Sequence, residues 1–184
     1  IIGGLKMKGK KEDDVNVKNL TISQSKGAGV YGEQGMSFHL DNLNIEKSEG
    51  CGVVVIGTQR NTMSNCQVSH SKASGVWVYK GLLTINGSGT SVHNNVTGGD
   101  DEEYGLWTQA SSSSIHLVAP LGITLKSITN NGGGGNYGGG GTIAIVIVKT
   151  MPEVRWADWS GIEIVGTIQE ATEDDSEDDS EDDY

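Results

Sequence analysis

The sequence is poor in the residues that mark several common kinds of protein. Its 184 residues include a single phenylalanine, two prolines and two cysteines. No stretch approaches the ~18 consecutive apolar residues of a membrane-spanning helix, so membrane insertion is not expected. The net charge of −11 argues against nucleic acids and anionic membrane surfaces as partners.

The two cysteines, Cys51 and Cys66, do not predict a disulfide. They occupy different columns of the sequence repeat described below: Cys66 replaces an inward leucine, and Cys51 lies beside a corner glycine. Cys66 is therefore expected to be a small core residue. This use of cysteine suits a reducing compartment.

Three segments between Val17 and Val78 repeat with a period of 23 residues. Each has an asparagine, two apolar residues separated by a polar one, a serine, a glycine and a valine, always in the same order. The main columns are Asn19, Asn42 and Asn65; Leu20, Leu43 and Cys66; Ser25, Ser48 and Ser71; and Gly29, Gly52 and Gly75. A period of this size indicates an architecture of stacked repeats.

The local pattern of one repeat is that of short β-strands. Apolar and polar residues alternate, and the runs are separated by Ser, Lys, Ala and Gly, which favour turns. One repeat is too short to bury its apolar face alone, so neighbours must stack with strands about 4.8 Å apart. The asparagine column is typical of stacked side-chain amides, and the glycine column fits a corner that needs positive φ or close backbone approach. The sequence therefore predicts an all-β fold, a parallel β-helix (solenoid) of about five to six coils.

The repeat pattern N-φ-x-φ-x-x-S-x-x-x-G-V-x-φ resembles the right-handed parallel β-helix repeats of the pectate-lyase-like superfamily. It is most similar to the variety shared by carbohydrate-binding proteins, sugar hydrolases and substrate-recruiting F-box proteins. The resemblance covers roughly residues 15–148. It implies the fold but no single activity, because the superfamily includes lyases, epimerases, fibre domains and recognition modules.

The composition divides the chain into four parts. We expect an N-terminal strand or cap at residues 1–14, the parallel β-helix at 15–148, a C-terminal capping segment at 149–169 and an acidic low-complexity tail at 170–184. The cap is expected because an uncapped last coil presents an unpaired strand edge. The tail should be disordered, and its charge suits a basic partner.

The segment at 149–169 carries Trp156 and Trp159 before an alternating apolar run, which favours a covering strand pair over a binding patch. The chain starts at Ile1 without an initiator methionine or a signal-peptide pattern, which is typical of a fragment or a processed piece.

The period slips after Val78. Residues 79–90 hold an insertion, residues 98–104 form an acidic loop, and residues 132–141 are glycine-rich. A shift of 29 residues places Asn94 in the Asn65 column. Loops inserted at equivalent points of successive coils project from one side of a solenoid, so we expect these three to share a face that binds.

Aromatic and acidic residues gather beside these loops. The candidate binding residues are Trp77, Tyr79, Tyr104 and Trp107, with Asp100 and Asp101 in an acidic rim. Flat rings can stack on sugars or anchor a protein partner, and the rim disfavours anionic polymers. The alternative that these rings merely cover the coil edges stays open.

Catalytic patterns are weak. Lyases and epimerases of this fold need a base and a charge neutraliser, yet Arg60 and Arg155 are the only arginines, and no carboxylate pair with a basic partner recurs in register. Residues 100–103 could supply oxygen ligands to Ca²⁺, but consecutive carboxylates on a loop are usually solvated, so no cofactor is expected.

Three histidines are spaced by 23 residues, a spacing that would stack them on successive coils as in a metal-binding or catalytic site. His70, His93 and His116 should nevertheless lie at different places on the coil, because the insertion breaks the register. We therefore predict a non-catalytic recognition or structural module that binds a protein partner or a glycan. The alternative is a carbohydrate-active enzyme on the same fold, namely a polysaccharide lyase, hydrolase or epimerase.

Overall fold

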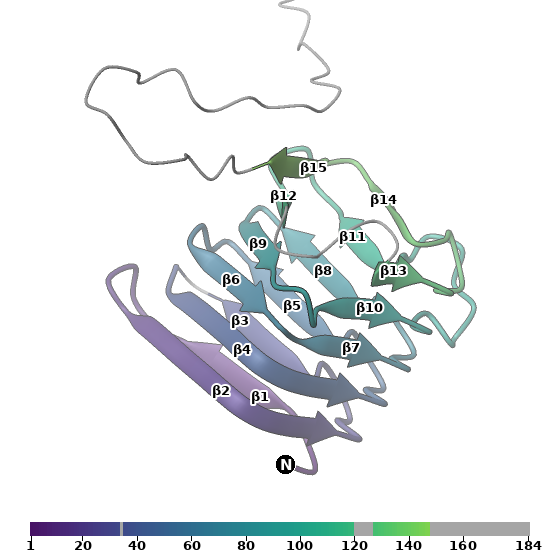
Figure 1. The fold of residues 1–184 in the computed structure, drawn as a ribbon, viewed down its shortest axis with the longest axis horizontal. Coiled ribbons are helices and arrows are strands. Elements are labelled where there is room, and N and C mark those ends of the chain that lie inside the picture. Colours follow the sequence, from purple (N-terminus) through teal and green to yellow (C-terminus); the bar gives the residue numbers. More distant parts are fainter. Residues whose placement is uncertain (34, 120–126, 148–184) are drawn as a thin grey trace, which may run out of the picture.

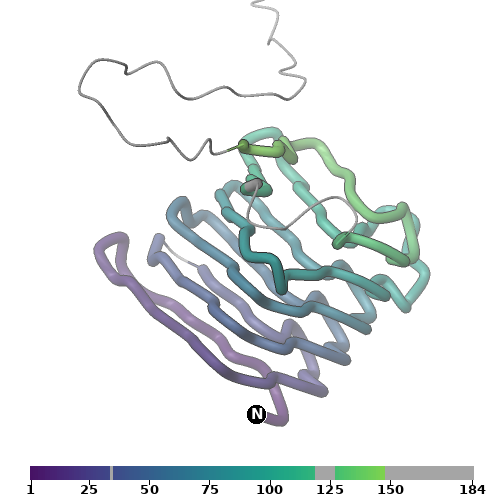
Figure 2. Tube along the Cα trace, viewed as in Figure 1, coloured from purple at the N-terminus to yellow at the C-terminus, as the bar shows by residue number. Residues whose placement is uncertain are grey.

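The computed structural model describes residues 1–33, 35–119 and 127–147, and in these ranges the chain is built from parallel strands without an α-helix. The chain passes repeatedly between two sheets, and each passage adds one layer to a stack (Figures 1 and 2). This is the right-handed parallel β-helix predicted from the sequence repeat.

The smaller sheet has six strands in the order β1-β3-β5-β8-β11-β14. Their bounds are β1 (Leu5–Lys8), β3 (Val30–Glu33), β5 (Val53–Ile56), β8 (Val76–Tyr79), β11 (Leu106–Thr108) and β14 (Tyr137–Gly139). Val30 pairs with Val53, and Val53 pairs with Val76, so this sheet reproduces the period of 23.

The larger sheet has nine strands. They are β2 (Asp14–Ser23), β4 (Ser37–Glu46), β6 (Asn61–Ser64), β7 (Gln67–Ser69), β9 (Leu82–Asn86), β10 (Ser91–His93), β12 (Ser114–Ala119), β13 (Ile128–Thr129) and β15 (Thr142–Ile147). The long strands β2 and β4 pair along most of their length, whereas later layers divide the same path between two shorter strands.

The asparagine column lies where the strands of the nine-stranded sheet bend. Asn19, Asn42 and Asn65 have φ angles of 55°, 56° and 51°. This left-handed conformation is costly for most residues, but asparagine tolerates it because its short amide can hydrogen-bond locally. The column therefore fixes the corner between the two halves of each long strand.

A second left-handed column follows these strands and contains Asn94, with φ of 54°. The prediction that Asn94 continues the Asn65 column is therefore wrong. Val92 pairs with Val68, which places Asn94 level with His70. The reason is that residues 87–90 form a loop inside the bend, where the Asn65 N–H donates to the Asn86 carbonyl.

The core is a stack of aliphatic side chains between the sheets. Its innermost members include Ile22, Ile45, Val68 and Val92 on one wall and Val30, Val53, Val76 and Leu106 on the other, all 0% exposed. Cys66 is also fully buried, as its place in the leucine column predicts. Cys51 and Cys66 are both free thiols.

The serine column is buried at the corner that leads to the six-stranded sheet. The next layers replace serine with asparagine: Asn95 accepts a hydrogen bond from the Ser71 N–H, and Asn131 accepts one from the Asn95 N–H. Asn95 also donates to the carbonyl of Val68. Sequence reasoning missed this change, because Asn94 and Asn95 are adjacent and only their register separates them.

The structure leaves the last described layer open. Tyr137 is in register with the fully buried Leu106, yet it is 51% exposed, and Ile145 is 36% exposed opposite the buried Leu117. The predicted cap at residues 149–169 and the predicted acidic tail at 170–184 lie outside the described residues.

Candidate functional site

Outward positions of the six-stranded sheet carry a row of aromatic rings. Trp77 on β8 pairs in register with Trp107 on β11, and the two indoles stack with centroids 5.6 Å apart and planes at 23°. Tyr79 lies 6.4 Å from Trp77 between ring centroids, at 33°. The fold thus brings three of the four predicted aromatic residues into one cluster.

Aliphatic residues continue this row on the neighbouring strand. Val54 pairs with Trp77, and Ile56 pairs with Tyr79. Val54 points away from the core, yet only 3% of it is exposed, because the side chains around it cover it. The apolar outward residues of β5 and β8, whose sequences are VVVI and VWVY, were the sequence signal for this coverage. We call Tyr31, Val54, Ile56, Trp77, Tyr79 and Trp107 the aromatic face.

Charged side chains border the aromatic face. Lys6 Nζ lies 4.9 Å from the ring centroid of Tyr31, and Lys80 Nζ lies 5.1 Å from that of Tyr79. Lys6 also pairs with Glu33 at 3.2 Å. Its hydrogen bond lowers the pKa of the Glu33 carboxyl. Both lysines are therefore held over tyrosine rings, where the ring quadrupole attracts a cation.

The row of register partners ends at a glycine of β14. The register partner of Trp107 on β14 is Gly138. A Cβ at Gly138 would lie 2.5 Å from the ring of Tyr104, and a Cβ at Gly134 would lie equally close to it. The Tyr104 ring therefore lies against the backbone of Gly134 and Gly138, and it fills the place that a side chain of residue 138 would take beside Trp107.

The acidic loop and the glycine run occupy one corner. The Gly134 N–H donates to the Glu103 carbonyl at 2.9 Å, and the Tyr104 N–H donates to Ser74 Oγ at 3.2 Å. Asp100 Oδ1 accepts a hydrogen bond from the Glu102 N–H. The glycine run is thus a backbone surface that supports the acidic loop.

The prediction that all three irregular segments share a face is wrong for most of the insertion at residues 79–90. This insertion begins at the end of β8 and contains β9, and its loop, residues 87–90, lies between β9 and β10 at the asparagine bend of the nine-stranded sheet. The acidic loop lies between β10 and β11, and the glycine run follows β13, contains β14 and ends before β15. The acidic loop and the first part of the glycine run stand beside the aromatic face, because both lead from the nine-stranded sheet to the six-stranded one. Of the insertion, only its start at Tyr79 belongs to this face.

The carboxylates of the acidic loop differ in environment. Asp100 and Asp101 are exposed, whereas Glu103 is half-buried. Burial, together with the charge of Asp100, raises the pKa of the Glu103 carboxyl. Within residues 1–33, 35–119 and 127–147, no three His, Cys, Asp or Glu side chains converge as metal ligands would.

As predicted, the three histidines lie at different places on the coil and do not form a ladder. His93 is level with Ser69, and His116 is level with Thr84. His70 and His93 nevertheless meet edge to face, with ring centroids 6.2 Å apart. Burial and the neighbouring His70 lower the pKa of the His93 imidazole.

A polar cluster that the sequence did not reveal surrounds His39 on the nine-stranded sheet. Its ring nitrogens lie 2.8 Å from Thr62 Oγ1 and 3.3 Å from Asp14 Oδ1. Arg60 approaches the same carboxylate at 3.9 Å and donates to the Lys11 carbonyl. The cluster ties successive coils together through exposed groups, and no sequence motif joins these residues.

Comparison with known families gives one match and no close relative. The chain matches the family described as the right-handed β-helix region over residues 3–120. No significant match is found among curated proteins or among solved structures. No helix in the described part of the chain is long and apolar enough to cross a membrane. With more than half of its length matched and its strands stacked in parallel register, the chain belongs to the right-handed β-helix family.

Proposed function

We propose that the chain is a non-catalytic recognition module that binds a glycan along its aromatic face. The observation that carries this proposal is the Trp77–Trp107 stack, which Tyr79 extends on the same outward side of the six-stranded sheet. A sugar ring would lie over the outward side of this row of rings. The position over Gly138 is not open to it, because the Tyr104 ring fills that place. Aromatic faces suit such contacts because they are flat, rigid and apolar.

The direction of the row fits a linear polymer. Its rings come from successive coils, which are about 4.8 Å apart, a spacing comparable to one sugar residue of an extended chain. The carboxylates of Asp100 and Asp101, in the loop before β11, can accept hydrogen bonds from sugar hydroxyls. Their charge disfavours polyuronates, so a neutral or basic glycan is the expected ligand.

The experiment is a glycan microarray probed with the purified chain and with Trp107→Ala. We expect Trp107→Ala to lose most of the bound signal while its melting temperature stays close to that of the wild type. Tyr137→Ala is the matched control, because Tyr137 is 51% exposed on the next strand but faces the open end of the solenoid. A large fall in melting temperature with unchanged binding would show that Trp107 is structural.

A protein partner is the second ligand class for the same face. Val54 and Ile56 add aliphatic surface to the rings, and buried aromatic and aliphatic anchors within a charged rim are typical of protein interfaces. The acidic loop would then favour a basic segment. Failure of every glycan on the array to bind the folded chain would favour this class.

An enzymatic role is the remaining candidate, and one observation favours it. The raised pKa of Glu103 is a property of general acids in glycoside-cleaving and lyase sites. We expect no activity, because no second carboxylate with a basic partner accompanies it in the described residues. Release of unsaturated uronate from pectate or alginate, abolished by Glu103→Gln, would overturn the non-catalytic assignment.

A further inference from the structure

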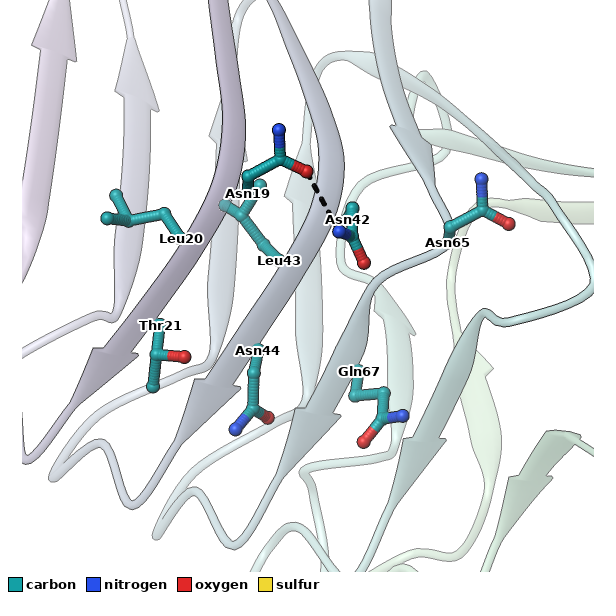
Figure 3. Close-up of a pocket in the computed structure, with 8 residues that line it drawn as sticks. All are labelled: Asn19, Leu20, Thr21, Asn42, Leu43, Asn44, Asn65 and Gln67. Carbon is teal, nitrogen blue, oxygen red and sulfur yellow. Dashed lines mark hydrogen bonds between the residues drawn. The ribbon is translucent and has the colours of Figure 1, made fainter.

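A hollow surface lies on the nine-stranded sheet, at the asparagine bend. It is a groove of about 350 Å³, lined by Asn19, Leu20, Thr21, Asn42, Leu43, Asn44, Asn65 and Gln67 (Figure 3). We call it the amide groove. It crosses three successive layers, from β2 through β4 to β7, and it is on a different sheet from the aromatic face.

Two rows of uncharged hydrogen-bonding side chains line the amide groove. One row is Asn19, Asn42 and Asn65, and the other is Thr21, Asn44 and Gln67, whose members pair in register from coil to coil. All eight lining residues are uncharged. The charged residues just before Asn19 and Asn42, Lys18 and Asp41, pair with each other at 3.8 Å.

Much of the hydrogen-bonding capacity of these rows is unused. Asn42 Nδ2 donates to Asn19 Oδ1 at 2.8 Å, and Asn65 Nδ2 donates to Ser64 Oγ at 3.3 Å. Within the part of the chain that the structure describes, the side chains of Asn44 and Gln67 make no hydrogen bond. A carboxamide offers two donors and two acceptor sites, so a ligand with many hydroxyls could be bound at several points.

The backbone holds these amides in place and closes one end of the groove. The bend residues are left-handed, and Leu43 beneath them is only 2% exposed, so the wall is packed against the core. At the far end, the loop of residues 87–90 folds against Asn65: a Cβ at Gly87 would lie 2.5 Å from Asn65 Oδ1, and the Gly89 N–H approaches that oxygen at 3.4 Å. The groove is therefore limited to a few sugar residues in length.

We propose that the amide groove is a second binding site and that it takes a neutral oligosaccharide. Vicinal sugar hydroxyls each donate and accept, which matches paired donor and acceptor atoms of a carboxamide. A charged ligand would find no counter-ion among the lining residues, and an apolar one would bury amides without partners, at a cost. This site is independent of the aromatic face.

The test is isothermal titration calorimetry of the full chain with cellohexaose, xylohexaose and mannohexaose, and with hexagalacturonate as the anionic comparator. The variant is Asn44→Ala with Gln67→Ala, which removes two groove amides and leaves the left-handed residues unchanged. Asn16→Ala is the matched control, because Asn16 is an exposed asparagine on the same sheet and outside the groove.

We expect at least one neutral hexasaccharide to bind and the double variant to weaken its binding at the groove about tenfold or more. Asn16→Ala should bind as the wild type does, and the groove component should persist in the Trp107→Ala background, where any contribution of the aromatic face is removed. Hexagalacturonate should not bind at the groove. Binding that is lost in Trp107→Ala and kept in the groove variant would assign the glycan to the aromatic face alone and overturn this proposal. Absence of binding by all three neutral hexasaccharides, or binding of an extended uncharged peptide in their place, would also overturn it.

Discussion

At the scale of single residues, the corner glycines are set by close packing. Gly75 does not have a positive φ, but a Cβ there would lie 2.5 Å from Val92 Cγ1 and 2.7 Å from the Gly105 carbonyl oxygen. We expect Gly75→Ala to destabilise the chain by about 1–3 kcal/mol, as overpacking does in other cores. Gly27→Ala is the control, because nothing lies within 4 Å of its Cβ position. Equal urea midpoints for the two variants would contradict this account of the corner.

The thiol of Cys51 predicts a pH dependence. Burial, followed by the charge of Glu103, raises its pKa to about 12. In the unfolded chain a cysteine ionises near pH ~8.5. The protonated thiol therefore makes its full contribution to the free energy of unfolding below that pH. This contribution is lost as the pH rises toward about 12, because the unfolded state releases a proton that the folded state keeps.

Cys51→Ala isolates this effect, because Ala28 and Ser74 occupy the equivalent positions in the neighbouring coils. We expect the melting temperature of the wild type to fall more steeply than that of the variant between about pH 9 and 11. Parallel curves in differential scanning calorimetry would show that the thiol does not contribute.

At the scale of elements, the asparagine bend gives a further prediction. Asn42 combines φ of 56° with a hydrogen bond to Asn19. Asn42→Ala should cost about 1–2 kcal/mol, because alanine cannot relieve a left-handed backbone. Asn42→Gly should cost less, since glycine adopts this conformation freely. Chemical denaturation measures both, and the opposite order would mean that the bend is not strained.

The register of the strands was predictable where the repeat is regular and not beyond it. The three repeats before Val78 define the coil, the buried leucine column and the place of Cys66. After the insertion, Val92 to Asn94 imitates Met63 to Asn65 in sequence, and both bend columns accept asparagine, so local pattern could not choose between them. In the structure Val92 pairs with Val68, so Asn94 lies in the second left-handed column. This register is possible because the loop of residues 87–90 fits within the asparagine bend.

The candidate site was predictable to a similar degree. Alternation along β8 and β11 placed Trp77, Tyr79 and Trp107 outward, and their contact follows from parallel register. The packing of Tyr104 on glycine backbone was not predictable, because it depends on how two loops stack. The amide groove was not predictable either. A column of asparagines in the sequence indicates a ladder of stacked amides, and only the bend of the strands in the structure makes that surface concave.

At the scale of the whole molecule, the two candidate surfaces use different sheets of one solenoid. The aromatic face belongs to the six-stranded sheet, and the amide groove belongs to the nine-stranded sheet. Each crosses several coils, because stacking repeats equivalent positions at a fixed spacing. A short repeat thereby produces binding rows without any long-range motif in the sequence.

The open C-terminal end of the described solenoid predicts the role of the chain that follows it. Tyr137 and Ile145 occupy inward positions, yet they are 51% and 36% exposed, while Leu106 and Leu117 one layer below are fully buried. We expect residues 149–169 to cover this end. A chain that stops after residue 148 should therefore melt at a lower temperature and self-associate through its exposed edge.

The matched control is a chain that stops after residue 169, which removes only the acidic segment. We expect its melting temperature to stay close to that of the full chain, because a run of like charges buries no apolar surface. Thermal denaturation with light scattering compares the three lengths. Equal melting temperatures for all of them would mean that residues 149–169 do not cap the solenoid. If the chain that stops after residue 169 already melts at a lower temperature and the chain that stops after residue 148 melts no lower, the acidic segment is the stabilising part, since only its removal separates the 169-residue chain from the full one.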